Sequence, residues 1–498
     1  MRKSGILMHL ASLPSEYGVG TMGAAARKFA DFLSDAGQQY WQILPLGPTS
    51  YGDSPYQSFS TYAGNPYFID LEELVEAGFL TRKEVEACDC GKAARDIDYG
   101  KLYENRMPLL KLAYERSLEK PDPKFTAFWT ENAWWLDDYG LFMAVKDIFD
   151  GNSWDQWAED IRYRWDNAMW YYKTNYSKEI GFYVWLQYLF FTQWQKLKKY
   201  ANDKGLKIIG DIPIYVAYDS ADVWAHPEMF QLDQERNPAA VAGCPPDGFS
   251  ADGQLWGNPL YRWDHHRNTG YDWWVTRISW CFRLYDVVRI DHFRGFDEYY
   301  AIPYGEETAV NGKWKKGPGM DLFRNIEKAL GKRDVIAEDL GFVTDSVRKL
   351  VHDSGFPGMK VVEFAFDVRD TGAASDYLPH NYIRNCVVYT GTHDNETLIG
   401  WWSSIDQRSR DMARDYMAAH YTPDRLINAP FITLAMRSIA DLCIIPMQDY
   451  LGLDNKSRMN KPSTVGDNWR WRMISDDTDD DLAEEIGRLT LMTGRSKM

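Results

Sequence analysis

Three buried-strand patterns that end in an acidic residue constrain this chain more than any other feature. Each is a run of apolar, mostly β-branched residues that leads to a carboxylate and then a loop: Val287–Gly295, Asp334–Gly341 and Val387–Asn395. A buried strand has no structural need for an acid at its tip, because ionised acids are rarely buried without a partner. The acids Asp291, Glu338 and Asp394 lie 47 and 56 residues apart, which suits parallel strands separated by helices. Barrel enzymes keep their chemistry at the carboxyl ends of such strands.

Short apolar runs bounded by Gly, Pro or charged residues predict further buried strands. Eight runs are found in all: Gly5–Leu10, Tyr40–Leu46, Lys207–Val216, Val287–Arg294, Asp334–Leu340, Met359–Phe366, Cys386–Thr392 and Leu442–Gln448. Helical patterns lie between most of them, as at Ala24–Ala36, Asp321–Leu330 and Thr344–Asp353. Eight strands that alternate with helices favour a closed (β/α)8 barrel over an open doubly wound sheet. We therefore expect an α/β fold of the TIM-barrel class.

Two gaps between the predicted strands are too long for simple helical crossovers. Residues 47–206 contain long amphipathic and Trp-rich stretches, so we expect a largely helical insertion between the second and third strands. Residues 217–286 include the Gly-, Pro- and Trp-rich stretch Gly243–Pro259, which predicts an insertion with a long active-site loop over the barrel mouth. The end of the chain shows no run of alternating strands. We expect one catalytic barrel over residues 1–498 without a C-terminal β-sandwich.

Charge and composition exclude several classes of function. The formal net charge of −16, from 72 acids and 56 bases, argues against electrostatic binding to nucleic acid or an anionic membrane. No window approaches about 18 uncharged apolar residues. His9 interrupts the apolar stretch near the start, so a signal peptide is not expected either. The 21 Trp, 31 Tyr and 23 Phe residues suit a protein that stacks flat, amphipathic ligands such as sugars.

The cysteines and one glycine-rich segment give no redox or nucleotide motif. Six cysteines are scattered along the chain, and the spacing of Cys88 and Cys90 does not match a CxxC redox or zinc motif. We expect reduced thiols in a cytoplasmic protein. Gly18–Gly23 matches GxGxxG, but the next predicted strand ends in Pro45-Leu46 and not in the acid that a dinucleotide site needs.

Two further patterns could suggest metal sites. Asp476–Asp481 is acidic, but Leu482 stands where a calcium loop needs Gly, so an acidic helix N-terminus is favoured. His265 and His266 are adjacent, and neighbouring residues do not share one face of a helix or strand, so a surface loop is favoured over a metal site. We expect neither a metal nor a cofactor.

The surroundings of the three acids suggest different chemical roles. The period of two in a strand puts Arg289 and Asp291 on one face, where the Arg would keep the acid ionised and oriented. Glu338 follows an apolar strand with no base beside it, so burial would raise its pKa, as a general acid requires. His393 lies next to Asp394 and adds a ring that can form hydrogen bonds to this third acid.

Each pattern alone also has a structural interpretation. Arg289 and Asp291 could form a buried ion pair, and Glu338 could cap a helix or face solvent. His393-Asp394-Asn395 could be a metal site or a tight Asx-turn. Together, a carboxylate held by Arg, a carboxylic acid on another strand and a third acid are typical of glycosyl transfer, because anionic groups stabilise a transition state that resembles an oxocarbenium ion.

Several segments also resemble a known family. The resemblance lies in Arg289–Phe296, Ile336–Gly341, Gly391–Thr397, Ser54–Ser60, Gly64–Tyr67, Gly210–Val216, Gln254–Pro259, Ile445–Asp449 and Arg458–Asn460. These segments are similar to those of 4-α-glucanotransferases, the amylomaltases of bacteria and disproportionating enzymes of plants, a branch of the α-amylase clan. The resemblance runs nearly end to end, and Ser54–Ser60 and Gln254–Pro259 are specific to this branch.

The resemblance implies a retaining double displacement that moves α-1,4-glucan segments between malto-oligosaccharides or starch-type glucans, which serve as donor and acceptor. Asp291 would be the nucleophile, Glu338 the acid and base, and Asp394 would bind hydroxyls of the distorted sugar. Retention predicts that the carboxyls of Asp291 and Glu338 lie about 5 Å apart. The resemblance further implies these substrate-binding residues: Ser54, Tyr56, Asp211, Phe249, Gln254, Trp256, Asn258, Arg289, His292, His393 and Asn460.

One departure from the family concerns the mouth loop. Tyr is common there after Pro-Pro-Asp, whereas this chain has Gly248 before Phe249, so acceptor selection or product size is expected to differ. The main alternative is an α-1,4-glucan hydrolase on the same scaffold, which differs only in whether water or sugar reaches the glycosyl-enzyme. A non-catalytic glucan-binding protein is a third hypothesis, and three intact acids argue against it. We expect a monomer or a weak homodimer.

Overall fold

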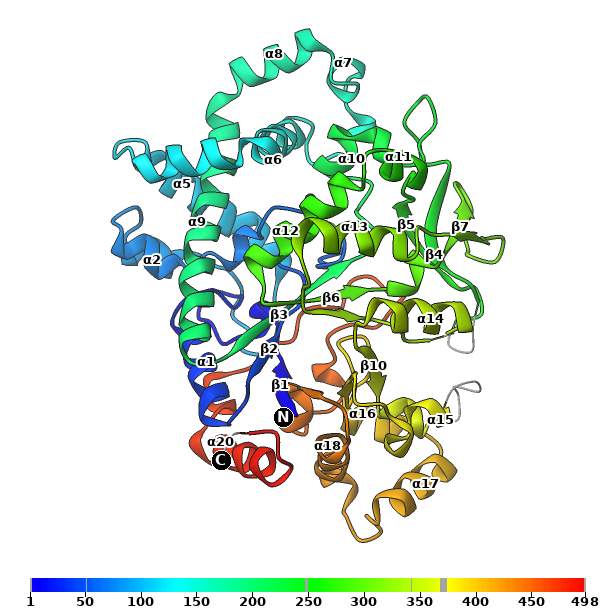
Figure 1. Ribbon diagram of the computed structural model, residues 1–498. Coiled ribbons are helices and arrows are strands. Elements are labelled where there is room, and N and C mark those ends of the chain that lie inside the picture. The colour runs from blue at the N-terminus through cyan, green and yellow to red at the C-terminus, as the bar shows by residue number, and fades with distance from the viewer. Residues whose placement is uncertain (1, 51, 247–249, 342, 368–373, 497–498) are drawn as a thin grey trace.

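Eight parallel strands close into a barrel at the centre of the molecule (Figure 1). The structure is a computed structural model that describes residues 2–50, 52–246, 250–341, 343–367 and 374–496. Around the barrel the strands are β1 (Lys3–Leu7), β12 (Leu442–Pro446), β11 (Cys386–Tyr389), β10 (Gly358–Val361), β9 (Val335–Ala337), β6 (Val287–Asp291), β3 (Lys207–Pro213) and β2 (Tyr40–Gln42). The predicted (β/α)8 barrel is confirmed.

All eight predicted strands are present, and each of them ends earlier than the sequence pattern suggested. The strand predicted to reach Leu46 ends at Gln42, and the strand predicted to reach Leu340 ends at Ala337. After β6 the chain leaves the ladder at once, because His292 adopts a left-handed conformation with φ of 52°. The apolar residues beyond each strand therefore form loops at the mouth, and the predicted acids lie on or next to these loops.

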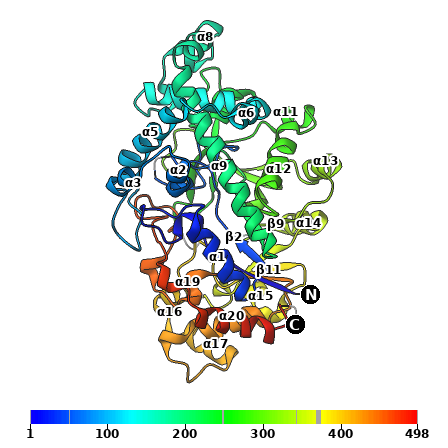
Figure 2. The same cartoon turned by 90° about the vertical axis from the view of Figure 1, so that its left-hand side faces the viewer.

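Helices cover the outside of the barrel. Those that alternate with the strands are α1 (Ala24–Asp35), α12 (Asp272–Leu284), α13 (Met320–Leu330), α14 (Asp345–Ser354), α15 (Ala374–Tyr377), α16 (Leu398–Ser404), α17 (Gln407–Met417) and α18 (Asn428–Arg437). The side chain of Thr344 caps the start of α14, and Gly355 ends it with φ of 71°. The chain ends meet on one side of the barrel (Figure 2), where Arg495 donates a 2.7 Å hydrogen bond to the Lys3 carbonyl oxygen.

The segment between β2 and β3 is largely helical and lies above and to the left of the barrel in Figure 1. Its helices are α2 (Leu71–Glu76), α3 (Arg82–Ala87), α4 (Tyr99–Lys101), α5 (Met107–Ser117), α6 (Pro123–Ile148), α7 (Glu159–Arg162), α8 (Asp166–Asn175) and α9 (Ser177–Asp203). The two long helices α6 and α9 pack against each other. Aromatic side chains join them to α12 through edge-on contacts, since the ring centroids of Trp135 and Phe191 lie 5.4 and 5.3 Å from that of Trp280.

The segment between β3 and β6 is more ordered than the predicted long loop. It contains α10 (Ala221–Ala225), α11 (Trp263–Asn268), β4 (Ala240–Cys244) and β5 (Gln254–Pro259). β4 and β5 join β7 (Glu298–Pro303) and β8 (Lys313–Lys316) in an antiparallel sheet of order β5-β4-β7-β8. The expectation of a loop throughout Gly243–Pro259 was therefore wrong, because Gly243, Gly257 and Pro259 lie in short strands.

The prediction of a surface loop at His265 and His266 was also wrong. Both residues lie in α11, and His266 is fully buried with its ring edge-on to Tyr261 at a centroid distance of 5.4 Å. Its Nε2 lies 3.1 Å from the Met229 carbonyl oxygen. The pattern of two adjacent His residues did not show this, because the aromatic neighbours Tyr261, Trp263 and Trp273 decide which ring is buried.

The segment that follows β12 is helical. The described residues 447–496 contain α19 (Met447–Tyr450), α20 (Asp480–Met492) and short 3-10 turns, with no β-strand among them. Asp479 caps α20 by accepting the Leu482 amide, so the acidic run at Asp476–Asp481 does lead into a helix N-terminus, as predicted. Throughout the described ranges, no helix has the length and apolar character needed to cross a membrane.

Candidate active site

A buried arginine joins two acids on β3 and β6. Asp211 and Arg289 face each other in the register of these strands, and Arg289 Nη1 lies 2.8 and 2.7 Å from the two carboxylate oxygens of Asp211. The same nitrogen lies 3.0 Å from Oδ1 of Asp291. The side chains of Asp211 and Arg289 are 0% and 3% exposed, so Arg289 is enclosed between both acids. Burial raises the pKa of Asp291, and the positive charge of Arg289 opposes this rise.

Glu338 follows directly after β9 and is held by backbone amides. Its Oε2 accepts a 2.6 Å hydrogen bond from the amide of His292, and its Oε1 accepts a 2.8 Å bond from the amide of Leu340. Burial and then the negative charge of Asp291 raise the pKa of Glu338 to about 7, against the opposing effect of Arg289. A carboxyl with this pKa can both give and accept a proton near neutral pH. The predicted effect of burial on this acid is confirmed.

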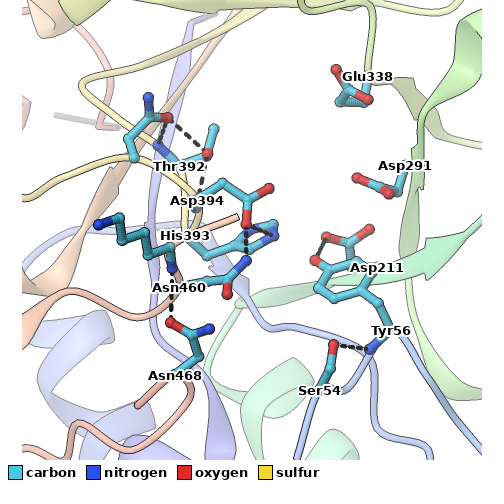
Figure 3. A network of polar contacts seen from close by, with 12 residues as sticks. Ser54, Tyr56, Asp211, Asp291, Glu338, Thr392, His393, Asp394, Asn460 and Asn468 are labelled. Atoms are coloured by element: carbon cyan, nitrogen blue, oxygen red, sulfur yellow. Dashed lines mark hydrogen bonds and ion pairs between the residues drawn. The ribbon is translucent and has the colours of Figure 1, made fainter. Parts of the chain in front are cut away.

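Asp394 lies in the loop after β11 and faces these two acids from the other side (Figure 3). Its Oδ1 accepts a 2.6 Å hydrogen bond from Nδ2 of Asn460 and lies 3.4 Å from Nε2 of His393. Asn460 also donates its backbone N–H to the carbonyl oxygen of His393, and Arg458 donates to the carbonyl oxygen of Asp394 at 2.6 Å. The chain segment after α19 therefore orients the third acid.

The loop after β11 is closed by the side chain of Asn395 and not by that of Asp394. Oδ1 of Asn395 accepts hydrogen bonds of 2.8 Å from both the backbone N–H and the hydroxyl of Thr392. The carboxylate of Asp394 is thus not used to close its own loop. In the described ranges no group of three or more His, Cys, Asp and Glu side chains is arranged to hold a metal ion.

Aromatic rings form one wall beside Asp211 and Asp394. Tyr56 donates its hydroxyl to Oδ2 of Asp211 at 2.9 Å, and its ring stacks on His393 with a centroid distance of 5.1 Å. The turn that carries Tyr56 is closed by Ser54, whose Oγ accepts the amide of Tyr56 at 3.2 Å. Trp469 lies 5.8 and 5.9 Å from the rings of Tyr56 and His393. Burial lowers the pKa of His393, so this ring is neutral at pH 7.

Residues of β5 form the wall next to β6. The partly exposed ring of Trp256 meets His292 edge-on at 4.8 Å, and its Nε1 donates to Oε1 of Gln254 at 3.0 Å. Asn258 is buried and donates to the carbonyl oxygen of Val216 at 2.8 Å, so it fixes β5 to the chain after β3. The predicted residues Gln254, Trp256 and Asn258 thus share one strand, and Trp256 is the one that reaches the neighbour of Asp291.

Some predictions for this site lie beyond what the structure describes, and some residues were not predicted. Gly248 and Phe249 of the mouth loop lie outside the described residues. Trp469 was not predicted to belong to the site, and no local signal marks it. Arg458 could have been included, since it stands two residues before Asn460 in a segment that carries the family resemblance.

A family model described as 4-alpha-glucanotransferase matches residues 8–476 of this chain. A 4-alpha-glucanotransferase of Clostridium butyricum is 48% identical over 490 residues, which cover 98% of this chain and 100% of that protein. The corresponding protein of Thermus thermophilus is 46% identical over 95% of both chains. An amylomaltase of Streptococcus agalactiae, solved in complex with acarbose, superposes with a TM-score of 0.96 at 41% identity and covers both chains completely.

These relatives separate the hypotheses drawn from the sequence. The two curated relatives are named as transferases, and each aligns with this chain over nearly its whole length. The hydrolase alternative is therefore not favoured. Together with a barrel that carries three acids at its mouth, the match shows that this chain belongs to the 4-alpha-glucanotransferase family and is an enzyme that transfers glycosyl groups.

Proposed function

We propose that the enzyme transfers α-1,4-glucan segments between malto-oligosaccharides by a retaining double displacement. In this mechanism a carboxylate oxygen of Asp291 attacks the anomeric carbon of the donor, while Glu338 gives its proton to the departing glycosidic oxygen. A hydroxyl of the acceptor sugar then attacks the glycosyl ester on Asp291, and its proton passes to Glu338. Both acids return to their starting states, and the configuration at the anomeric carbon is kept.

The observation that supports this proposal most is the setting of Glu338. Its carboxyl is tied to the backbone amide next to Asp291, and its pKa is about 7 because of burial and the charge of Asp291. Asp291 instead has the positive charge of Arg289 at 3.0 Å, which opposes the rise of its pKa, so the two acids on neighbouring strands have the different surroundings that paired carboxylates in glycosyl transfer require. The separation of about 5 Å between the two carboxyls stays a prediction.

We assign the remaining residues to substrate binding. Asp394, oriented by Asn460 and His393, would accept hydroxyl hydrogen bonds from the distorted sugar. Nε2 of His292 is buried without a hydrogen-bond partner among the described residues, and we assign a sugar hydroxyl as its partner in the complex. Tyr56 and Trp256 would pack against sugar rings, since each presents a partly exposed aromatic face.

Incubation of the purified enzyme with maltotriose alone tests the proposed function. Transfer of a maltosyl unit from one molecule to another gives glucose and maltopentaose, and further rounds give a ladder of longer oligomers. Chromatography over time should show chain lengthening from the first time points. Glucose and maltose without any longer oligomer would contradict transfer and indicate hydrolysis.

Two substitutions test the mechanism with a matched control. Asp291→Asn removes the nucleophile, and we expect a loss of about 10⁴-fold or more in transfer rate. Asp334→Asn is the control, because Asp334 stands at the opposite end of the barrel next to β9 and its side chain is 66% exposed. The control should keep wild-type activity. Full activity of Asp291→Asn would rule out the double displacement.

We further propose that the chain acts as one catalytic unit in which residues 47–206 and 217–286 are insertions that shape the barrel mouth. The aromatic contacts between α6, α9 and α12 support a rigid connection of the first insertion to the barrel. The free thiols of all six cysteines support the cytoplasm as the place of action. Light scattering during gel filtration tests the expected monomer or weak homodimer.

A further inference from the structure

Two cysteine thiols lie against each other just after α3. Sγ of Cys88 and Sγ of Cys90 are 2.8 Å apart, and either of them can donate the hydrogen. The backbone brings them together, because the amide of Cys90 donates a 3.0 Å hydrogen bond to the carbonyl oxygen of Cys88. Both cysteines are free thiols. Cys88 is partly exposed and Cys90 is buried, so solvent reaches the pair from the Cys88 side.

A buried cation lies next to this pair. Arg106 is 0% exposed on the π-helical turn Leu102–Arg106. Its Nη2 donates to the carbonyl oxygen of Ile69 at 2.6 Å, whereas its Nε and Nη1 have no hydrogen-bond partner among the described residues. Burial of an unpaired guanidinium is costly, so a compensating negative charge is expected close by. Burial lowers the pKa of Arg106, and negative charge on Cys90, Cys88 and Asp70 opposes this effect.

Asp70 also acts on Arg106, but its carboxylate is engaged by other donors, and the thiol pair is a second group that can carry a negative charge beside this cation. The carboxylate of Asp70 accepts a 2.6 Å hydrogen bond from the Thr21 hydroxyl and also accepts the amides of Glu72 and Glu73 at the start of α2. One proton shared between Cys88 and Cys90 leaves a single negative charge on the two sulfurs. The hydrogen bond from Cys88, together with the charge of Arg106, lowers the pKa of Cys90 to about 7.

We propose that Cys88 and Cys90 form a peroxide-reactive thiol pair that closes to an intrachain disulfide, with Arg106 as the positioning residue that holds the thiolate. The hydrogen bond to Cys90 and then burial raise the pKa of Cys88, so the resting negative charge lies mainly on Cys90. Because either sulfur can donate the hydrogen across 2.8 Å, transfer of this proton to Cys90 places the charge on Cys88, the sulfur that an oxidant reaches. Thiolates react with hydroperoxides, whereas thiols do not. The buried Cys90 is then the resolving thiol.

The reaction balances with a hydroperoxide as the oxidant. The Cys88 thiolate attacks a peroxide oxygen, so an S–O bond forms, the O–O bond breaks, and the departing oxygen leaves with its electron pair and takes up a proton. The Cys90 sulfur next attacks the sulfur of the Cys88 sulfenic acid. The S–S bond forms, and the hydroxyl leaves as water with the proton of Cys90. Two thiols lose two electrons, and the peroxide gains them.

Peptide mass mapping of the full-length enzyme after treatment with hydrogen peroxide tests the proposal. We expect the peptide that contains Cys88 and Cys90 to lose the mass of two hydrogen atoms and to regain it with dithiothreitol. Cys281 and Cys443 are buried thiols with raised pKa values because of burial, so they serve as internal controls and should stay unmodified. If the pair stays reduced under conditions that oxidise free cysteine, the proposal is wrong.

Two variants separate the roles of the sulfurs. Cys90→Ser removes the resolving thiol, so oxidation should stop at a sulfenic acid on Cys88, seen as the gain of one oxygen atom and trapped by dimedone. Cys88→Ser leaves only the buried sulfur, and its reaction should be about tenfold slower or more. A sulfenic acid that forms at equal rates in both variants would contradict the assignment of Cys88 as the attacking residue.

The pH dependence of alkylation tests the role of Arg106. In the wild-type enzyme the rate of alkylation of the pair by iodoacetamide should rise with a midpoint near pH 7. In Arg106→Gln the midpoint should rise toward about 8.5, the range of an ordinary thiol, without reaching it, because the hydrogen bond from Cys88 still lowers the pKa of Cys90. A wild-type midpoint at or above that range would overturn the proposal, and this measurement stands even if the Arg106 variant fails to fold.

Discussion

The backbone amide of His292 donates a 2.6 Å hydrogen bond to Oε2 of Glu338. Because His292 follows Asp291 directly, this bond fixes the acid after β9 to the backbone at the tip of β6. The relative position of the two acids is therefore set by the main chain and by a left-handed turn with φ of 52° at His292. The buried side chain of Arg289 adds a 3.0 Å contact to Asp291, and such preorganisation is what catalysis by paired carboxyls needs.

The first prediction concerns the pH dependence of transfer. Glu338 must be protonated for the first step, and burial with the charge of Asp291 raises its pKa to about 7. Below that pH the acid form dominates, and above it the protonated fraction falls about tenfold per pH unit. We expect kcat/KM for maltotriose to fall in the same way above pH 7. With α-glucosyl fluoride as donor, whose leaving group needs no proton, this decline should vanish, and a decline that persists would contradict the role of Glu338.

The second prediction concerns stability. The pKa of Glu338 is higher in the folded enzyme than the usual carboxyl value, so the folded state holds this proton more tightly than the unfolded state. Glu338 therefore destabilises the fold at pH 8, where it is ionised, but not at pH 4.5 or below. The Gln side chain in Glu338→Gln cannot ionise, so the substitution should stabilise the fold more at pH 8 than at pH 5. We expect the change in the free energy of unfolding to be more favourable at pH 8 by on the order of 1 kcal/mol. Urea unfolding at both pH values checks this, and equal effects would be inconsistent with the raised pKa.

The third prediction concerns the cation between β3 and β6. Arg289→Met would leave Asp211 and Asp291 without the charge that compensates them, and we expect a loss of about 3–5 kcal/mol in the free energy of unfolding. The double variant Arg289→Met with Asp211→Asn should recover part of this loss, because one of the unpaired carboxylates is removed. Urea unfolding of the two variants and of Asp211→Asn completes the cycle. If the free energy of unfolding of Arg289→Met lies within about 1 kcal/mol of the wild-type value, Arg289 is not needed to compensate both acids.

The barrel and its three acids could be predicted because they leave local signals in the sequence. An apolar run of strand length followed by an acid is visible within ten residues, as at Val335–Glu338. The pairing of Asp211 with Arg289 is not visible in this way, since it depends on the register of β3 against β6. The residues that pair across two strands distant in the sequence are not marked by any local hydrophobic pattern.

The antiparallel sheet and Trp469 were missed for related reasons. β4 and β5 are short and contain Gly243 and Gly257, so their alternation is weak. Trp469 meets His393 only because a segment after β12 folds back over the barrel mouth. Nothing near Trp469 separates it from the other Trp residues of the chain, most of which are buried structural side chains.

The fourth prediction concerns the orientation of Asp394. Asn460→Ala removes the 2.6 Å hydrogen bond to Oδ1 of this acid, and we expect kcat to fall by about 10- to 100-fold with little change in fold stability. Asn468→Ala is the matched control, since Asn468 accepts the backbone amide of Lys461 in the same segment and does not contact Asp394. Initial rates on maltotriose compare the two variants. Equal losses in both would indicate that the segment as a whole, and not the bond to Asp394, matters.

The fifth prediction separates two roles of Tyr56. Tyr56→Phe removes the 2.9 Å hydrogen bond to Asp211 but keeps the ring that stacks on His393 at 5.1 Å. Tyr56→Leu removes both. If the ring packs against a sugar, Tyr56→Phe should leave KM for maltotriose within about twofold, whereas Tyr56→Leu should raise KM by about tenfold, the equivalent of roughly 1.4 kcal/mol of stacking. Steady-state kinetics on both variants measure these KM values. The aromatic face is unchanged in Tyr56→Phe, so a large increase of KM in that variant would contradict stacking and assign the effect to the hydrogen bond between the hydroxyl and Asp211.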